Sequence, residues 1–178
     1  MGLRVNINPH NNLFNLAHFN IDIVKTKVAE SDQEGLGLHC KNCIISTSFA
    51  VEAFVNYVGF KKIRHWNEKK NWYEKLKRIY KTIDEPLDLE REPLRTLKQL
   101  KDIRNELAHS KLIERNVLVR NKGEAQKAMK ADWDEYLNPD FVVHAYEQAE
   151  AFQEHLMEKF DISLFETLTS SRGTISGE

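Results

Sequence analysis

The chain has 178 residues, of which 41% are hydrophobic, 7 are Gly and 4 are Pro, a composition that favours one compact domain and makes two improbable. The 26 Lys and Arg residues against 27 Asp and Glu give a net charge of -1, which excludes a polybasic or polyacidic binder and confines electrostatic function to local sites. Two cysteines are too few for a disulfide framework, no signal-peptide pattern opens the chain and polar residues interrupt its apolar stretches, so we expect a cytoplasmic protein with no membrane partner.

Helical patterns begin early in the chain. Over 11–29, apolar residues recur at steps of three and four, which predicts an amphipathic helix that ends before Gly35 and Gly37. The next segment, 38–58, is apolar nearly all round, as in a helix with neighbours on several sides, and we expect Gly59 to cap its end.

Three more helices are predicted further along. One covers 72–83, and another begins near Pro93, which the first turn of a helix tolerates. The last begins after Asn138, a capping residue, and Pro139, and it buries one apolar face up to residue 160.

Two regions are not covered by these helices. Between the fourth and the last helix we expect a short strand and turn near 113–123 and a further short helix within 124–137. Residues 170–178 are small and polar, which predicts a disordered tail. With about five helices and no run of alternating strands, the prediction is an all-α helical bundle, one domain over 1–169.

Charge is concentrated in residues 61–81, where nine basic residues face two acidic ones. Aromatic residues interleave with the basic ones: Trp66, Trp72, Tyr73 and Tyr80. A cationic surface with aromatic platforms is what single-stranded nucleic acid requires, so Lys69, Lys70 and Lys77 are candidate RNA contacts. The alternative is the solvated face of an ordinary amphipathic helix.

A motif closes the fourth helix: Arg104-Asn105-Glu106-Leu107-Ala108-His109. A chain of this composition contains about 0.03 copies of Arg-Asn followed by His at this spacing by chance. If this Arg and His pair cleaves RNA without a metal, the nucleophile is the adjacent 2'-hydroxyl of the RNA. His109 can transfer the proton near neutral pH, and Arg104 can stabilise the charged phosphorane.

The helix geometry leaves the arrangement of the motif open. Arg104 and His109 lie about 140° apart on an ideal helix, whereas Asn105 shares a face with His109 and could orient its imidazole. Alternatively these are ordinary polar residues, and His109 helps to cap the helix. Glu52 and Asn56 share a face of the most apolar helix, where an unpaired carboxylate is costly, and Arg104 is the partner we favour over solvent or a lysine.

The stretch from Leu100 to Ser110 resembles the motif helix of HEPN proteins, and that from Ser46 to Asn56 resembles their apolar helix with its embedded Glu and Asn. The resemblance is to toxin-like or abortive-infection-like members and spans roughly 38–160. It implies a helical bundle, a homodimer whose two motifs face each other, an RNA substrate, a possible antitoxin partner, and no metal or other cofactor.

By this resemblance the catalytic residues are Arg104, Asn105 and His109, and the supporting residues are Glu52 and Asn56. Many HEPN proteins are metal-independent ribonucleases, while others are inactive or bind nucleotides. We therefore expect a metal-independent endoribonuclease in a toxin or defence role. The first alternative is a non-catalytic HEPN module that binds RNA, a nucleotide or a protein, and the second is a structural helical dimer.

Overall fold

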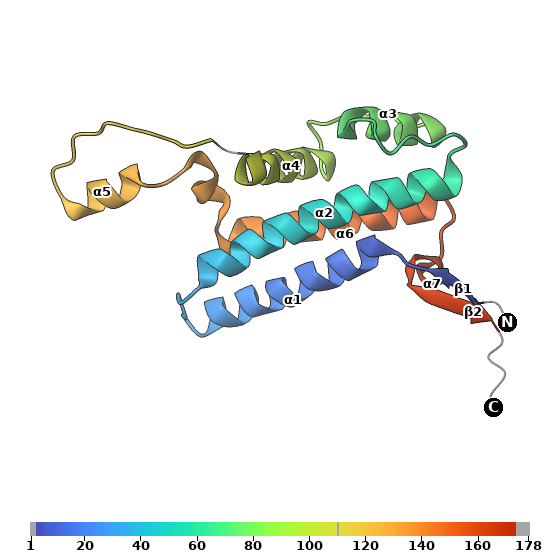
Figure 1. Cartoon of the computed structure of the whole chain (residues 1–178), viewed down its shortest axis with the longest axis horizontal. Coiled ribbons are helices and arrows are strands. Elements are labelled where there is room, and N and C mark those ends of the chain that lie inside the picture. The colour runs from blue at the N-terminus through green and yellow to red at the C-terminus, as the bar shows by residue number, and fades with distance from the viewer. Residues whose placement is uncertain (1–2, 110, 174–178) are drawn as a thin grey trace.

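The computed structural model describes residues 3–109 and 111–173 and consists mainly of helices (Figure 1). Its elements in chain order are β1 (Leu3–Asn6), α1 (Pro9–Ala29), α2 (Leu36–Lys62), α3 (Trp72–Thr82), α4 (Leu94–His109), α5 (Lys122–Ala128), the 3-10 helix η1 (Asp132–Tyr136), α6 (Pro139–Lys159), α7 (Leu164–Thr167) and β2 (Ser170–Gly173). The predicted all-α class is confirmed, and the five predicted long helices correspond to α1 to α4 and α6.

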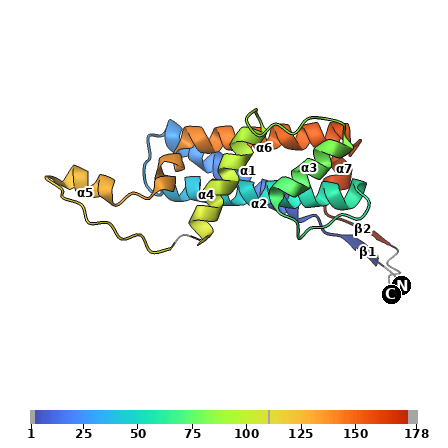
Figure 2. The ribbon, with the colours of Figure 1, turned by 90° about the horizontal axis from the view of Figure 1, so that it is seen from above.

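Helix α2 is the centre of the bundle. It contacts α1, α3, α4 and α6. Helices α1 and α6 run alongside it, while α3 and α4 cover another side (Figures 1 and 2). A helix with neighbours on several sides must be apolar on several faces, as the sequence predicted for this segment. Its largest fully buried side chains are Ile44, Phe54 and Val55.

Local sequence determines several helix boundaries. The Asn138 side chain accepts a hydrogen bond from the backbone N–H of Phe141 (2.9 Å), so this residue caps α6 as predicted. Gly59 does not end α2, which continues to Lys62. The indole ring of Trp66 lies against Gly59, where a Cβ atom would overlap it. Glycine is therefore needed at this position for packing against Trp66 and not for capping the helix.

The two strands pair the ends of the chain. β1 and β2 are antiparallel, with Leu3 opposite Gly173. A strand pair is thus present, but not near 113–123 as predicted, because Asn121 accepts from the N–H of Glu124 (3.0 Å) and opens α5 instead of a turn. The predicted disordered tail over 170–178 is wrong for 170–173, since pairing uses the backbone and needs no apolar side chains. The remainder, 174–178, lies outside the described residues.

Only α2 among the described helices has the length and apolar composition of a membrane-crossing segment. In this bundle 61% of its most apolar stretch is buried. Its apolar faces are therefore largely covered by the helices around it, as in the core helix of a folded bundle.

Candidate active site

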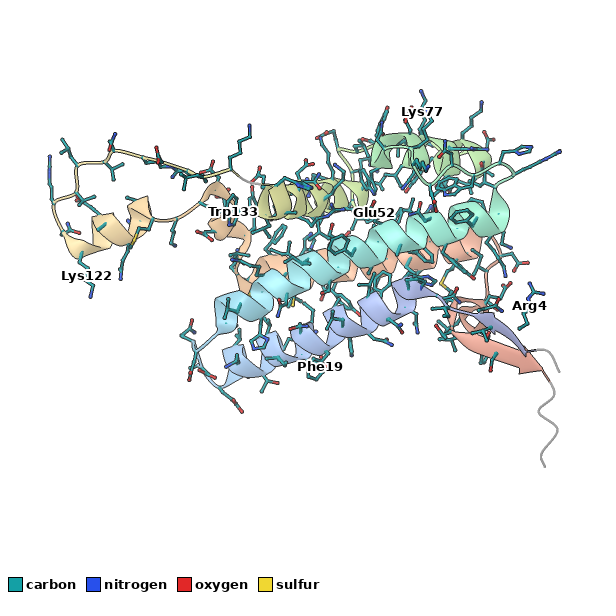
Figure 3. All side chains as sticks on the ribbon, in the orientation of Figure 1. Arg4, Phe19, Glu52, Lys77, Lys122 and Trp133 are labelled. Atoms are coloured by element: carbon teal, nitrogen blue, oxygen red, sulfur yellow. The ribbon has the colours of Figure 1, made fainter. Side chains whose placement is uncertain are left out.

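The motif lies where predicted, at the end of α4, and Arg104 extends from it toward α2. One guanidinium nitrogen of Arg104, Nη2, donates to Oε2 of Glu52. Figure 3 shows Glu52 on the side of α2 that faces α4. The predicted pairing of these two residues is therefore present, and it ties the motif helix to the central helix of the bundle.

The Arg104 guanidinium is held on three sides. Its Cζ lies 4.7 Å from the centre of the Phe49 ring, a distance at which a cation is attracted to the ring face. Nη1 donates to Oδ1 of Asn105 (2.9 Å). Nε is buried and has no hydrogen-bond partner among the described residues. The cation is thus fixed in position while part of its donor capacity stays unused.

The burial of Arg104 and Glu52 differs from the expectation. We predicted that Glu52 would be the buried charge in need of a partner. The Arg104 side chain is 15% exposed and the Glu52 side chain 39% exposed. The carboxylate reaches partly into solvent, whereas the guanidinium is covered by the aromatic ring and by α2. Arg104 is therefore the charge that depends more on its partner.

Among the described residues, Asn105 and His109 are not joined by the hydrogen bond that the shared helix face suggested. The Asn105 amide oxygen is bonded to Arg104. His109 is exposed at the last position of α4, and within residues 3–109 and 111–173 no hydrogen bond to its ring is found. Asn105 therefore positions the arginine of the motif instead of the histidine.

A single chain keeps Arg104 and His109 apart. Five residues along an α-helix correspond to a rise of about 7.5 Å and a rotation of about 140° between the two positions. Arg104 accordingly faces α2, while His109 faces solvent. One chain alone does not enclose a phosphate between these two side chains.

Asn56 belongs to a different contact. Its side-chain oxygen accepts from Nε1 of Trp66 (3.4 Å), the same indole that packs on Gly59. The predicted support of the motif by Asn56 is therefore not seen. Phe49, which the sequence analysis missed, contacts Arg104 instead. It stands three residues before Glu52, on the same face of α2, and this spacing was the available signal.

The candidate RNA-contacting lysines lie away from His109. Lys69 and Lys70 precede α3 and Lys77 is on it, and all three are exposed. In both views α3 lies beyond the first turn of α4, while His109 is at the other end of that helix (Figures 1 and 2). The Lys77 side chain points away from the bundle (Figure 3). The structure does not bring these lysines together with the motif.

Part of the basic run has structural roles. Arg78 donates to the backbone carbonyls of Arg64 and, at 2.8 Å, His65. Lys61 pairs with Glu166 (3.0 Å). Tyr80 is buried, which raises the pKa of its hydroxyl to about 12. Of the four interleaved aromatic residues, only Tyr73 is classed as exposed, so the predicted series of stacking platforms is largely absent from the surface.

A second feature of α4 was not predicted. A cavity of about 400 Å³ is lined by Leu89, Glu90, Arg95, Lys98, Gln99, Asp102, Ile103, Glu106 and Tyr136. Its lining includes none of the three catalytic candidates. In the sequence its charged residues look like an ordinary polar helix face, and the cavity lies where Leu89 and Tyr136 of η1 meet that face of α4.

No metal site is evident in the part of the chain that the structure describes, where no three His, Cys, Asp or Glu residues gather to hold an ion. Cys40 and Cys43 are buried in α2. Burial raises the pKa of the Cys40 thiol to about 11 and that of Cys43 to about 12, so both are protonated at neutral pH. They pack as small apolar residues.

Comparison with known proteins adds no further assignment. No family model, no curated protein and no solved structure matches the chain. The resemblance to HEPN proteins therefore depends on the two sequence segments, 46–56 and 100–110, and the geometry around Arg104 is the basis for judging it.

Proposed function

We propose that the chain is a metal-independent endoribonuclease of HEPN type, acting in a toxin or defence role. The supporting observation is the fixed guanidinium of Arg104, held by Glu52, Phe49 and Asn105, on a helix that ends with the exposed imidazole of His109. This cleavage requires a positioned cation, a proton acceptor and a proton donor, and one chain offers the cation and one proton-transfer group.

The reaction has a simple atom balance. The 2'-oxygen of the RNA attacks the neighbouring phosphorus and gives its proton to a base, a bond forms between that oxygen and phosphorus, and the bond to the 5'-oxygen breaks. The departing 5'-oxygen takes a proton from an acid. His109 suits either proton transfer, because an imidazole has one ring nitrogen that can accept a proton and one that can donate it. Arg104 stabilises the extra negative charge of the phosphorane with its remaining N–H donors.

Two proton transfers favour two copies of the chain. One chain supplies one His109, and its Arg104 faces away from it. A symmetric homodimer with the motif helices near the two-fold axis supplies a second histidine and completes the site. The proposed toxin role also includes an antitoxin protein as a partner. The lysines Lys69, Lys70 and Lys77 then bind parts of the RNA remote from the cleaved bond.

A non-catalytic HEPN module that binds RNA, a nucleotide or a protein partner is the second candidate. One observation favours it: Arg104 already has a carboxylate partner in Glu52 and does not meet His109 within one chain. In such a module the guanidinium serves the packing of α4 on α2, and the exposed imidazole has no catalytic role.

The deciding experiment is cleavage of a mixed RNA pool in EDTA. We expect products with 2',3'-cyclic phosphate and 5'-hydroxyl ends, and no cleavage of DNA, which lacks the 2'-hydroxyl. His109→Ala and Arg104→Ala should each lower the rate about a hundredfold or more. His18→Ala, which removes an exposed histidine on α1, is the matched control and should keep full activity.

Three results would contradict the proposal: cleavage of DNA, a requirement for a divalent metal, or full activity of His109→Ala. Absence of cleavage by the wild-type chain, together with RNA binding that Arg104→Ala abolishes, would support the non-catalytic module instead.

A further inference from the structure

An arm leaves the bundle directly after the motif helix. We define it as residues 111–131, an irregular stretch followed by α5 and a short return to η1. Figures 1 and 2 show it projecting beyond the end of the bundle in both views. Helix α5 contains no buried residue. The arm is thus held at its two ends and is open to solvent between them.

The arm carries apolar side chains that nothing in the described chain covers fully. Leu118 is completely exposed and Leu112 is 84% exposed. The other large apolar residues classed as exposed in the arm are Ile113, Val117, Val119 and Met129. Isolated exposed apolar residues are common on proteins, but six within one short projecting segment are typical of a surface that another protein covers.

The arm's backbone is also free to bind. Among the described residues, no backbone group of 111–119 forms a hydrogen bond. The few internal contacts are made by side chains, such as Arg115, which donates to the Lys130 carbonyl (3.2 Å) and pairs with Asp132 (3.0 Å). Extended chain with free N–H and C=O groups is suited to lie along a partner surface.

A groove of fitting chemistry lies at the end of the bundle from which the arm departs. It has a volume of about 410 Å³ between the end of α1 and the start of α6. Its apolar lining is formed by Val24, Val28, Ala29, Pro139 and Val143, and its charged or polar lining by Lys25, Asp140, His144 and Glu147. Two of these four are acidic, whereas the arm has six basic residues against two acidic ones, a net charge of +4.

We propose that the arm of one copy docks into this groove of a second copy, with Leu118 among the apolar side chains it buries. Both halves of the contact are on the same chain, so exchange across a two-fold axis uses each arm and each groove once and closes the assembly. Nine extended residues span up to about 30 Å, enough to cross between two bundles. The inference specifies the homodimer invoked in the proposed function and rests on that function only for the catalytic meaning of the dimer.

Light scattering after size exclusion tests the contact. The wild-type chain of 20.8 kDa should elute as a dimer at tens of micromolar, and Leu118→Glu should elute as a monomer with an unchanged circular dichroism spectrum, because Leu118 makes no covering contact in the single chain. Phe19→Glu is the matched control, since Phe19 is an exposed apolar residue of α1 that does not line the groove (Figure 3). It should remain dimeric.

Mixing separates arm exchange from arm-to-arm pairing. Val28→Glu changes the groove and should also give a monomer. Mixed with Leu118→Glu, it should form heterodimers, because one intact arm then meets one intact groove. Monomeric wild type, dissociation by Phe19→Glu, or no heterodimer in the mixture would each overturn the proposal. So would unchanged dimerisation of Leu118→Glu with loss of RNA binding, which would make the arm an RNA-binding element.

The proposed arm contact and the proposed ribonuclease activity can be contradicted independently of each other. A wild-type dimer that leaves RNA intact contradicts the proposed ribonuclease and keeps the arm contact. Cleavage by a monomeric wild type contradicts the arm contact and keeps the ribonuclease.

Discussion

His10 is enclosed in the core although its ring has no polar partner. It is 1% exposed, and its ring centre lies 4.5 Å from that of Tyr57 and 5.5 Å from that of Phe54. Neither ring nitrogen has a hydrogen-bond partner among the described residues. Burial lowers the pKa of His10 from 6.5 to about 4, because the charged imidazolium loses its hydration there.

This lowered pKa predicts a loss of stability in mild acid. The unfolded chain binds the proton below pH 6.5, whereas the folded chain resists it until about pH 4, so the contribution is complete above pH 6.5 and is lost as the pH falls toward 4. Between pH 7 and pH 5 the free energy of unfolding should fall by about 2 kcal/mol from this group. Urea unfolding at the two pH values measures it.

His10→Leu provides the control, because it keeps an apolar side chain of similar size without a titrating group. Its unfolding free energy should fall by about 2 kcal/mol less than that of the wild type over the same interval. Equal losses in the two proteins would show that His10 is not the source.

At the scale of the elements, the two glycines of α2 predict opposite effects of the same substitution. Gly59→Ala places a Cβ atom within the indole ring of Trp66 and should lower the free energy of unfolding by about 1–3 kcal/mol. Gly37→Ala meets no atom within 4 Å and should raise it by up to about 1 kcal/mol through helix propensity alone. Thermal or urea unfolding of both variants checks the pair. Stabilisation by Gly59→Ala would show that the indole moves aside easily.

The long helices could be predicted because their signals are local. Apolar spacing and capping residues such as Asn138 act within a few positions of the chain, and α1, α2, α3, α4 and α6 were found in this way. Gly59 and Asn121 were misassigned because each local sequence is compatible with two structures. A glycine before a break can cap a helix or leave room for a neighbouring side chain, and an Asn-Lys-Gly sequence can form a turn or begin a helix. The structure that formed was decided by the Trp66 side chain, seven residues after Gly59, in one case and by the α5 helix in the other.

In the candidate site, too, some contacts could be predicted from the sequence and others could not. The expectation that a carboxylate on an apolar helix needs a cation, together with the place of Arg104 in the motif, favoured the contact of Glu52 with Arg104 over solvent or a lysine, and that contact is present. The bond from Arg104 to Asn105 and its stacking on Phe49 depend on the rotamer of the arginine and on the crossing of α4 over α2. The spacing of Phe49 and Glu52 places both on one face of α2, but it does not specify the arginine rotamer that meets them.

At the scale of the whole molecule, α4 separates the lysines near α3 from the histidine at its far end (Figure 1). If those lysines bind RNA, the triple variant Lys69→Glu, Lys70→Glu, Lys77→Glu should weaken binding. The slope of log affinity against log salt concentration should also become shallower by about 2, because each lost phosphate contact on single-stranded RNA removes about 0.7 from it. Binding measured by fluorescence anisotropy over a salt series checks both effects.

The matched control makes the same change in net charge elsewhere, with Arg91→Glu, Lys98→Glu and Lys159→Glu in one protein. This variant should lose less affinity and keep a steeper slope than the first. Equal losses in the two variants would mean that net charge, and not the position of the lysines, governs RNA binding, and the basic run would then be the solvated face of a helix.

The pairing of β1 with β2 has a practical consequence for the topology of the chain. Because Leu3 lies opposite Gly173, a short linker can join these two residues, and the chain can be reopened by circular permutation within the exposed arm. Such a permutant keeps every helix of the bundle but turns the arm into two free ends. Fusion domains joined before β1 and after β2, in turn, follow two paired strands, which lie on the side of the molecule opposite the arm (Figure 1).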